Sequence, residues 1–288
     1  MSIISNLRKF YRKYIHINAM DKIIYGVLDN MVNLYCIVRR YHFPAKYIRR
    51  WKLDFLGDLY EKETMVLVKK IMRPGMTIVD IGAHIGYFTR AFSKSTGSAG
   101  VVYAFEADPE NFEVLEKNTN FMSNVRRYPT AISDHVGKID FYHCEEKAGC
   151  NSTLPNLPLD YKMKKISVYA TDLDTALEQA GVKHVDLIKI DIEGGEVTAL
   201  KGMKKTLEQK DISLIIEFAP AWIVAAGVTP QGFLSELASL GFNLFAIMND
   251  GLIKLNPNDN SYVELLPKTE TAFNEFLNIY CVKGDGVE

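Results

Sequence analysis

The chain has 288 residues, a formal net charge of −1 and a hydrophobic content of 48%. This length supports one large domain with a sizeable core. The near-neutral charge argues against a protein that binds nucleic acid over a broad basic surface. The four cysteines form no C-x-x-C pair, which argues against zinc, and scattered thiols suit a reducing cytosol better than a disulfide framework.

The first fifty residues are basic, and their pattern predicts a helix with one apolar face. Lys and Arg are opposed there only by Asp21 and Asp29, and large apolar side chains recur at helical spacing: Ile3, Ile4, Leu7, Phe10, Tyr11, Tyr14 and Ile15. The favoured interpretation is that this face packs on the protein's own core. Attachment to an anionic membrane surface and binding of an acidic partner are the alternatives.

No targeting segment is predicted, because charges interrupt the first twenty residues and no apolar run approaches the ~20 residues of a spanning helix. We therefore expect a cytoplasmic protein, with membrane contact limited to its periphery. We expect residues 1–60 to form a helical extension and residues 61–288 to form the main domain.

From residue 61 onward, apolar strands alternate with amphipathic helices. Helices are predicted over 61–72, 87–95, 109–122, 174–181, 196–209 and 230–241. Strands are predicted over 77–83, 101–107, 125–133, 137–145, 165–172, 185–192, 212–219, 243–249 and 275–283. This alternation is typical of an α/β fold with a doubly wound, mostly parallel sheet. The last two strands lack a helix between them, so we expect an antiparallel pair at the sheet edge.

The stretch TIVDIGAHIGYFTRAF, residues 77–92, places an acid and two glycines where a strand passes to a helix. Gly82 and Gly86 allow a sharp turn and the close approach of a ligand. The helix after them has free N–H groups at its start. Glu106 ends the next strand, where a carboxylate can accept hydrogen bonds from ribose hydroxyls. The pattern therefore predicts a cofactor that contains a nucleoside.

The loop departs from the dinucleotide-binding pattern G-x-G-x-x-G, because His84 replaces the middle glycine. Asp80 lies just before the loop, and a carboxylate there suits a cationic ligand better than a pyrophosphate. S-adenosylmethionine fits, since it carries a sulfonium and an ammonium group. A nicotinamide-dependent oxidoreductase and a cofactor-binding module without catalysis are the alternatives.

Five segments together resemble the FkbM-type S-adenosylmethionine-dependent methyltransferases: VDIGAHIGYFT, VYAFEADPENFEVLEKN, AISDHVGKIDFY, VDLIKIDIEGGEVTALKGM and LIIEFAP. The IKIDIEGGE block is the most specific of them, and the resemblance covers residues 63–283. It implies a Rossmann-like sheet and methyl transfer, usually to a hydroxyl oxygen of a sugar, glycolipid or natural product. The family loop often has Asn where this chain has His84, and an imidazole can still donate one hydrogen bond.

The resemblance also implies the cofactor-binding residues. Asp80 and the two loop glycines would line the methionine part of S-adenosylmethionine, and Glu106 would hold the ribose. Ala107 and Asp108 would border the adenine, with Ser133 and Asp134 at the next strand end, and His84 belongs to the glycine loop. In chain order the set is Asp80, Gly82, His84, Gly86, Glu106, Ala107, Asp108, Ser133 and Asp134.

The acceptor side is predicted from charges that follow the central strands. Lys189, Asp191 and Glu193 alternate along one predicted strand and would point to one face. A structural ion pair of Lys189 with an acid is one interpretation, because charges in an apolar strand are costly unless paired. The other places these residues and Glu217 beside the transferred methyl group as candidate bases. A lysine base needs a lowered pKa. Asp191 and Glu217 are also candidate Mg²⁺ ligands, although we expect no metal requirement.

A small polar segment, AGCNSTLP at 148–155, lies between two predicted strands. Asn151 and Ser152 are predicted to bind a sugar-like acceptor, with an ordinary surface turn as the alternative. His143 and His184 are interpreted as structural or exposed. The predicted partner is a small-molecule, saccharide or lipid-linked acceptor and no nucleic acid.

Overall fold

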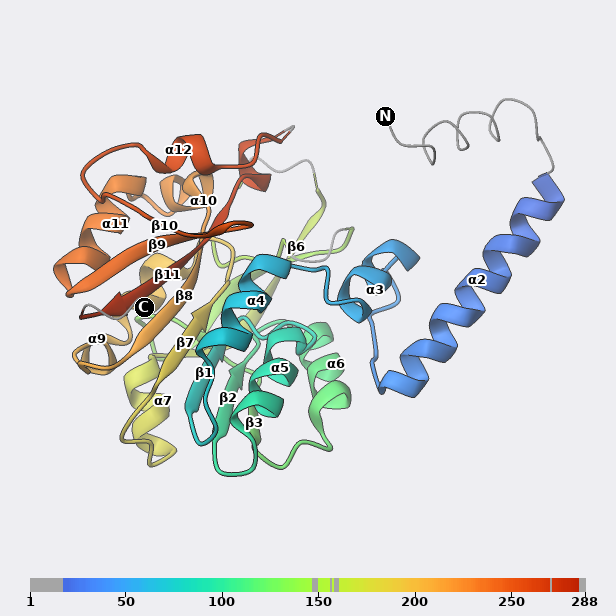
Figure 1. Ribbon diagram of the computed structural model, residues 1–288, viewed down its shortest axis with the longest axis horizontal. Coiled ribbons are helices and arrows are strands. Elements are labelled where there is room, and N and C mark those ends of the chain that lie inside the picture. Colours follow the sequence, from blue (N-terminus) through green and yellow to red (C-terminus); the bar gives the residue numbers. More distant parts are fainter. Residues whose placement is uncertain (1–17, 147–149, 156, 158–160, 270, 285–288) are drawn as a thin grey trace.

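An eight-stranded sheet runs through the centre of the protein, between two layers of helices (Figure 1). The computed structural model describes residues 18–146, 150–155, 157, 161–269 and 271–284. The strand order is β10-β9-β11-β8-β7-β1-β2-β3. The strands are β1 Thr77–Ile81, β2 Val101–Phe105, β3 Val125–Tyr128, β7 Leu187–Ile190, β8 Ser213–Phe218, β9 Phe242–Met248, β10 Gly251–Lys254 and β11 Leu277–Lys283.

The sheet is mostly parallel, as predicted. β8, β7, β1, β2 and β3 pair in parallel, so their carboxyl ends meet at one edge of the molecule. β11 pairs antiparallel with both β8 and β9, and β10 pairs antiparallel with β9. The predicted antiparallel pair of 243–249 and 275–283 is confirmed, but its position is different. β11 is inserted beside β8, and the edge strand is β10, whose short and largely exposed sequence gave no strand pattern.

Each face of the sheet is covered by a helical layer with its own apolar core. One layer packs on Ile78, Val102 and Leu187 and the other on Val79, Ile188 and Ile216. The first contains α4 Lys62–Ile71, α5 Tyr87–Thr96 and α6 Pro109–Thr119. The second contains α7 Leu173–Gln179, α8 Glu196–Lys201, α9 Lys204–Leu207, α10 Pro220–Ala225, α11 Pro230–Ser239 and α12 Tyr262–Leu265. A doubly wound α/β fold is therefore confirmed.

A second, three-stranded sheet stands beside the carboxyl ends of β1 and β2. It has the order β4-β6-β5, with β4 Ala131–Ile132, β5 Gly137–Cys144 and β6 Met163–Thr171. The prediction of one strand over 125–133 is wrong, because β3 and β4 belong to different sheets. Pro129 lies between them, and a proline has no N–H to continue a strand ladder.

The second helical layer differs from the prediction in three places. The helix expected over 196–209 is two helices, which break at Gly202 where a Cβ would lie 1.9 Å from the carbonyl oxygen of Ser133. The segment after β8 forms α10, which begins at Pro220 and was not predicted. The break at Gly202 depends on a contact between distant segments, whereas the proline that begins α10 is a local signal. The expectation of no helix between 243–249 and 275–283 is wrong, because α12 lies there.

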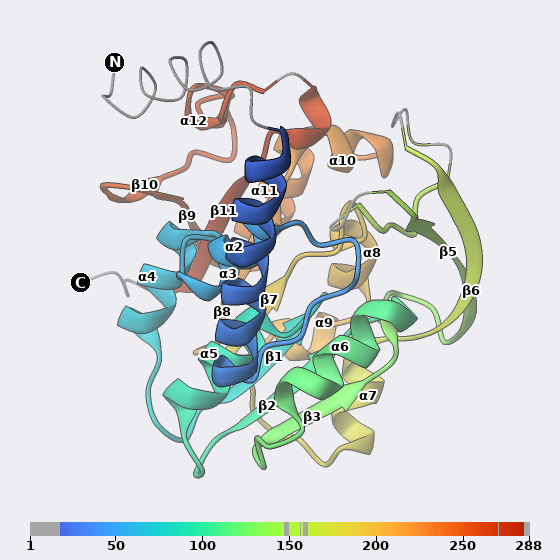
Figure 2. The same ribbon diagram turned by 90° about the vertical axis from the view of Figure 1, so that its right-hand side faces the viewer.

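The amino-terminal part of the chain forms an arm and a patch of core. α2 Asn18–Arg39 projects from the body and leads to α3 Arg49–Leu56, as Figures 1 and 2 show from two sides. Tyr41, Tyr47 and Phe55 are buried in the same core cluster as α4 and α5. The helix predicted from residues 3–15 lies outside the described residues, and the boundary at residue 60 stays a prediction. No helix in the described ranges is long and apolar enough to cross a membrane.

Candidate active site

A cavity of about 560 Å³ opens at the carboxyl ends of β1, β2, β7 and β8. Ligands of doubly wound sheets bind at such a position, and this volume suits a small-molecule ligand. The predicted site residues that line it are Gly82, His84, Glu106, Ala107, Asn151, Asp191, Glu193 and Glu217. The others do not belong to the described lining: Asp80, Gly86, Asp108, Ser133, Asp134, Ser152 and Lys189.

The turn after β1 depends on three residues with positive φ: Gly82 at 79°, His84 at 52° and Gly86 at 88°. A Cβ on Gly82 would lie 1.8 Å from the carbonyl oxygen of Asp191, and one on Gly86 would lie 2.9 Å from a methyl carbon of Leu115. The glycines therefore permit the tight turn, as predicted. Other parts of the chain fill the space of the missing Cβ atoms, and the close approach of a ligand to this turn, where Gly82 lines the cavity, stays a prediction.

Glu106 follows β2 and connects two loops at the cavity wall. Its Oε2 accepts a hydrogen bond from the backbone N–H of His84 at 2.7 Å, and its Oε1 accepts one from the N–H of Asp108 at 2.9 Å. The side chain is 6% exposed, and burial raises the pKa of Glu106 to about 8. Each oxygen keeps a second lone pair. This carboxyl group therefore fits the hydroxyls of a ribose in the cavity.

Asp80 ends β1 and is buried with one oxygen unsatisfied. Its Oδ2 accepts a hydrogen bond from the Thr89 hydroxyl at 2.5 Å, whereas its buried Oδ1 has no hydrogen-bond partner. Burial raises the pKa of Asp80, and the nearby charge of Lys189 opposes this shift. An unpartnered buried oxygen is costly, and a cationic donor would satisfy it. The role of Asp80 toward the cationic part of a cofactor stays a prediction, since the residue lies outside the described lining.

His84 connects the glycine loop to the amino-terminal part of the chain. Its Nε2 forms a hydrogen bond of 2.7 Å with the hydroxyl of Tyr47, which precedes α3. Burial lowers the pKa of His84 to about 4, so the imidazole is neutral at pH 7. A neutral ring has one donor and one acceptor nitrogen. When Nε2 accepts the hydrogen bond from the Tyr47 hydroxyl, the proton is on Nδ1, and Nδ1 is the nitrogen that can donate to a cofactor.

Lys189 and Asp191 form an ion pair below the acceptor side of the cavity. Nζ lies 2.7 Å from Asp191 Oδ2, and the Lys189 side chain is 2% exposed. Although burial opposes the charge, the carboxylates of Asp191, Glu61 and Asp80 together raise the pKa of Lys189. A lysine base needs the opposite shift. The geometry therefore favours the ion-pair interpretation, in which Lys189 orients Asp191.

Glu193 reaches the cavity from a strained turn. β7 ends at Ile190, so the prediction that Glu193 continues one strand face is wrong. Glu193 has φ 48° and Gly194 has φ 91°. The buried carboxyl group of Glu196 holds this turn, because it accepts hydrogen bonds from the N–H groups of Ile192 at 2.9 Å and Gly194 at 2.8 Å. Burial raises the pKa of Glu196 to about 7.

Glu217 completes a group of acids on the acceptor side. It lies in β8, is 8% exposed and lines the cavity with Asp191 and Glu193. Burial and the neighbouring carboxylates of Asp191 and Glu193 raise the pKa of Glu217 well above its usual value. A protonated Glu217 donates a hydrogen bond, whereas an ionised neighbour accepts one. The acceptor side can therefore both orient and deprotonate a hydroxyl group.

The segment 150–155 places its two predicted residues differently. Asn151 lines the cavity, and its Oδ1 accepts a hydrogen bond from the N–H of Cys144 at 2.9 Å. Ser152 is fully buried, and its hydroxyl donates to the carbonyl oxygen of Glu193 at 2.7 Å. The described part of this segment is therefore tied to the Glu193 turn, and Ser152 positions that turn from behind the cavity wall.

On the side predicted for adenine, only Ala107 of the four candidates lines the described cavity. Asp108 begins α6, and its Oδ1 accepts a hydrogen bond from the N–H of Asn111 at 2.9 Å. Ser133 is buried, while Asp134 is exposed. The roles of Asp108, Ser133 and Asp134 toward a cofactor stay predictions.

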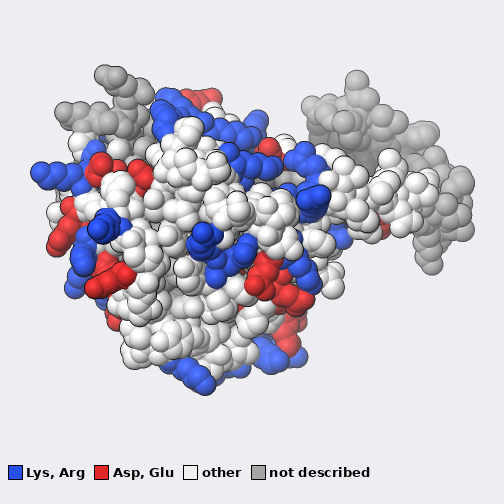
Figure 3. Space-filling model, turned by 90° about the horizontal axis from the view of Figure 1, so that it is seen from below, with Lys and Arg blue, Asp and Glu red and all other residues white. Residues whose placement is uncertain are grey.

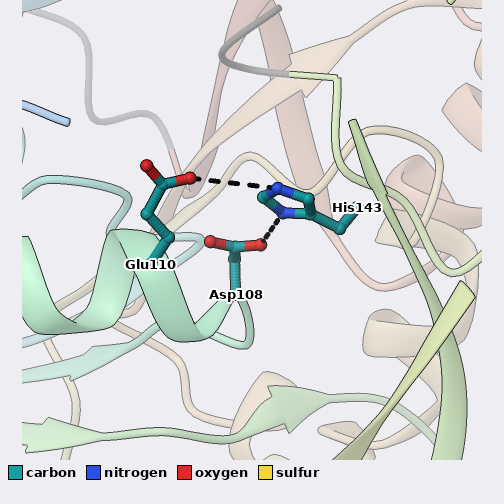
Figure 4. A group of neighbouring side chains, drawn as sticks. All are labelled: Asp108, Glu110 and His143. Atoms are coloured by element: carbon teal, nitrogen blue, oxygen red, sulfur yellow. Dashed lines mark hydrogen bonds and ion pairs between the residues drawn. The ribbon is translucent and has the colours of Figure 1, made fainter. Parts of the chain in front are cut away.

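Asp108 also belongs to a cluster with Glu110 and His143 (Figure 4). In the described part of the chain, this is the one group of three or more potential metal ligands within 4.8 Å of one another. His143 Nδ1 contacts Asp108, and the ammonium of Lys46 lies 3.1 Å from Glu110 Oε2. Because that ammonium already supplies a cation, we assign the cluster to joining α6, β5 and the amino-terminal segment. Asp191 and Glu217 belong to no such group, and their predicted metal role stays a prediction.

Aromatic side chains form much of the remaining wall and were not predicted. The described lining includes Tyr60, Phe141, Tyr161, Trp222, Phe273 and Phe276. Trp222 Nε1 donates to the carbonyl oxygen of Phe273 at 3.1 Å, and the two rings meet edge to face with centroids 5.3 Å apart. The sequence held one local signal for this wall: Trp222 comes four residues after β8, and residues that follow a parallel strand lie near the cavity. The other aromatics come from distant segments.

Comparison with known proteins identifies the family. The Methyltransferase FkbM domain matches residues 80–244, more than half of the chain. The chain is 29% identical over 153 residues to the 2-O-methyltransferase NoeI of Sinorhizobium fredii, which covers 49% of this chain and 63% of NoeI. It is 23% identical over 183 residues to the methyltransferase sdnD of Sordaria araneosa, which covers 54% of this chain and 69% of that protein.

The chain also aligns with the crystal structure of an FkbM methyltransferase from Methylobacillus flagellatus, with 14% identity and a TM-score of 0.42. That alignment covers 89% of this chain and 60% of the other. The match to NoeI likewise spans less than two thirds of that relative. The family profile, in contrast, includes the glycine loop, Glu106, Asp191 and Glu217 in one continuous match. The chain belongs to the FkbM family of methyltransferases.

Proposed function

We propose that this protein transfers a methyl group from S-adenosylmethionine to a hydroxyl oxygen of a sugar, glycolipid or natural product. The observation that supports this proposal is the cavity itself, which has the buried carboxyl group of Glu106 on one wall and a group of acids on the other. Glu106 lies after β2, and Asp191, Glu193 and Glu217 lie at β7 and β8. Family membership removes the basis for a nicotinamide-dependent oxidoreductase.

The chemistry divides between the two walls. S-adenosylmethionine supplies an electrophilic methyl group on a good leaving group, so the chain's residues mainly position reactants and exclude water. Glu106 accepts hydrogen bonds from ribose hydroxyls, and its backbone donors fix its orientation. The aromatic wall formed by Tyr60, Trp222 and Phe276 restricts access of water to the reacting groups.

We assign the proton transfer to Glu193. Asp191 accepts a hydrogen bond from Lys189 at 2.7 Å, which fixes its orientation beside the acceptor. Glu193 stands on a backbone with φ 48°, and such strain is concentrated at functional sites. As the acceptor hydroxyl attacks, its proton passes to a Glu193 carboxylate oxygen, and Glu217 donates a hydrogen bond that orients the acceptor.

The residues that line the cavity indicate the chemical class of the acceptor. The described lining combines carboxyl groups, the amide of Asn151 and several aromatic rings, and it holds no Lys or Arg. Such a surface fits a polyhydroxylated acceptor without negative charge. The name of NoeI states 2-O-methyl transfer, which supports oxygen as the acceptor atom here. We propose that the reaction occurs in the cytoplasm and without Mg²⁺.

The test compares ligands and then measures transfer. S-adenosylhomocysteine should raise the thermal midpoint, whereas NAD should not, because only the former fits a site without a pyrophosphate-binding glycine. At a hundredfold excess over Kd the stabilisation is ~2.7 kcal/mol. Transfer of a tritiated methyl group to a panel of sugars, glycolipids and polyketides then identifies the acceptor, with and without a chelator. Stabilisation by NAD alone would contradict the proposal, and binding without transfer to any acceptor would favour a non-catalytic module.

A further inference from the structure

The arm formed by α2 exposes a continuous apolar stripe. Seven large side chains recur at spacings of three and four residues, which places them on one side of the helix. Their exposed fractions run from 40% to 70%, whereas Val32 and Cys36 face the core. We call this set the α2 stripe: Ile24, Val27, Leu28, Met31, Leu34, Tyr35 and Val38.

An exposed apolar surface of this extent marks an interaction site, because leaving it in water forfeits the hydrophobic stabilisation of each side chain. In Figure 3 the visible face of the arm is almost free of charge, with Lys and Arg where it meets the body. The helix has 22 residues, about 33 Å at 1.5 Å per residue. It is not apolar enough to cross a bilayer.

Basic residues flank the α2 stripe, and their positive charge favours a partner with negative charge. Arg39 and Arg40 end the arm, and α3 adds Arg49, Arg50 and Lys52. Asp29, on the arm, is already paired with Arg49 at 2.7 Å. Over residues 1–60 the sequence holds 11 Lys and Arg against 4 Asp and Glu, although the whole chain has a net charge of −1. The positive charge is therefore concentrated at this end.

We propose that the α2 stripe docks on an anionic lipid bilayer, with the helix lying in the plane of the interface. Apolar side chains enter the boundary between headgroups and acyl chains, and the flanking Lys and Arg are attracted to anionic headgroups. Two copies of this surface would repel each other electrostatically, which disfavours a dimer through the stripe. The proposal is independent of the methyl-transfer reaction.

The test is vesicle flotation of the full chain. The protein should float with vesicles of equal parts phosphatidylcholine and phosphatidylglycerol, and less with phosphatidylcholine alone or at high salt. The triple variant Val27→Gln, Met31→Gln, Leu34→Gln should lower the bound fraction at least about tenfold. A matched triple variant of exposed valines elsewhere, Val66→Gln, Val136→Gln and Val263→Gln, should float like the original protein.

Folding and cofactor binding are controlled on the same samples. All three proteins should give the same circular dichroism and the same thermal shift with S-adenosylhomocysteine, because the stripe lies outside the cavity. Absence of flotation of the original protein, or equal flotation of the stripe variant, would overturn the proposal. A dimer that the stripe variant dissociates, without flotation, would assign the stripe to a second copy of the chain instead. Loss of methyl transfer with intact flotation would count against the proposed function alone.

Discussion

The cofactor side and the acceptor side of the cavity hold their carboxyl groups in different ways. On the cofactor side, Glu106 is held by two backbone N–H groups, and the glycine turn is closed by contacts within the chain. On the acceptor side, Asp191, Glu193 and Glu217 crowd together, and Lys189 is the buried cation among them. Backbone donors hold the carboxyl group on the cofactor side, whereas on the acceptor side burial and the neighbouring carboxylates raise the pKa of Glu217. Each experiment below perturbs one wall and leaves the other intact.

The largest effect is expected for Glu193→Gln. Loss of the proton acceptor should lower kcat by about 10²- to 10⁴-fold, while the Kd of S-adenosylhomocysteine remains unchanged. Single-turnover kinetics and calorimetry measure the two quantities. Glu116→Gln, an exposed carboxylate on α6, is the matched control and should retain full activity. Weaker cofactor binding with an unchanged kcat would indicate that Glu193 acts on the cofactor and not on the acceptor.

Lys189→Met should strongly destabilise the fold, because it leaves the Asp191 carboxylate without its buried partner. The free energy of unfolding should fall by ~3–5 kcal/mol. Lys69→Met removes the exposed partner of Asp58 and should cost less than about 1 kcal/mol. Urea unfolding of both variants gives the comparison. Equal, small losses would show that the Lys189 pair is not part of the structural framework.

Glu106→Gln tests the cofactor wall. The amide presents an NH₂ group to one of the two backbone donors that the carboxylate accepts, so the loop must shift. The Kd of S-adenosylhomocysteine should rise about 10- to 100-fold through loss of charge-assisted hydrogen bonds. The turnover of bound cofactor should change much less. A variant with normal affinity would remove Glu106 from the ribose site.

The pH dependence of cofactor affinity should report the same group. Burial raises the pKa of Glu106 to about 8 in the cofactor-free protein, so the carboxyl group is mostly protonated at pH 6. Ribose hydroxyls that donate to it favour the ionised form, lower its pKa and release a proton on binding. Affinity should therefore rise between pH 6 and pH 8, by up to about tenfold per unit. Calorimetry in buffers of different ionisation enthalpy measures the release, and Glu106→Gln should abolish it.

The smallest effect is expected for Tyr47→Phe. The change removes the hydroxyl that contacts His84 Nε2 and leaves the ring in the core cluster. Cofactor affinity should fall by a few fold, corresponding to about 0.5–1.5 kcal/mol for one hydrogen bond. NMR titration of His84 should show a changed pKa in the same variant. Trp51→Phe, at the edge of the same aromatic cluster, is a packing control and should leave the titration unchanged.

The sequence predicted what depends on local patterns. Strand-end acids such as Glu106 and Asp191 were found because parallel strands bring their carboxyl ends together. The division between β3 and β4 was foreseeable from Pro129 but was not predicted. The break before α9, the edge strand β10 and the aromatic wall around Trp222 depend on contacts between distant segments. Asp108 was assigned to the cofactor from the family resemblance and Ser152 to the acceptor from its residue type, and the structure shows hydrogen bonds of both side chains within the chain itself.

The hydrogen bond between Tyr47 and His84 limits how far the chain can be truncated from its amino-terminal side. The family match begins at residue 80, yet a hydroxyl thirty-three positions upstream touches the ring in the cofactor loop. A truncated protein starting at residue 61 would keep the whole sheet and lose that support, together with the Tyr41 and Phe55 side chains beneath it. Residues 41–56 would then support the loop at the cavity and could not be removed without changing it.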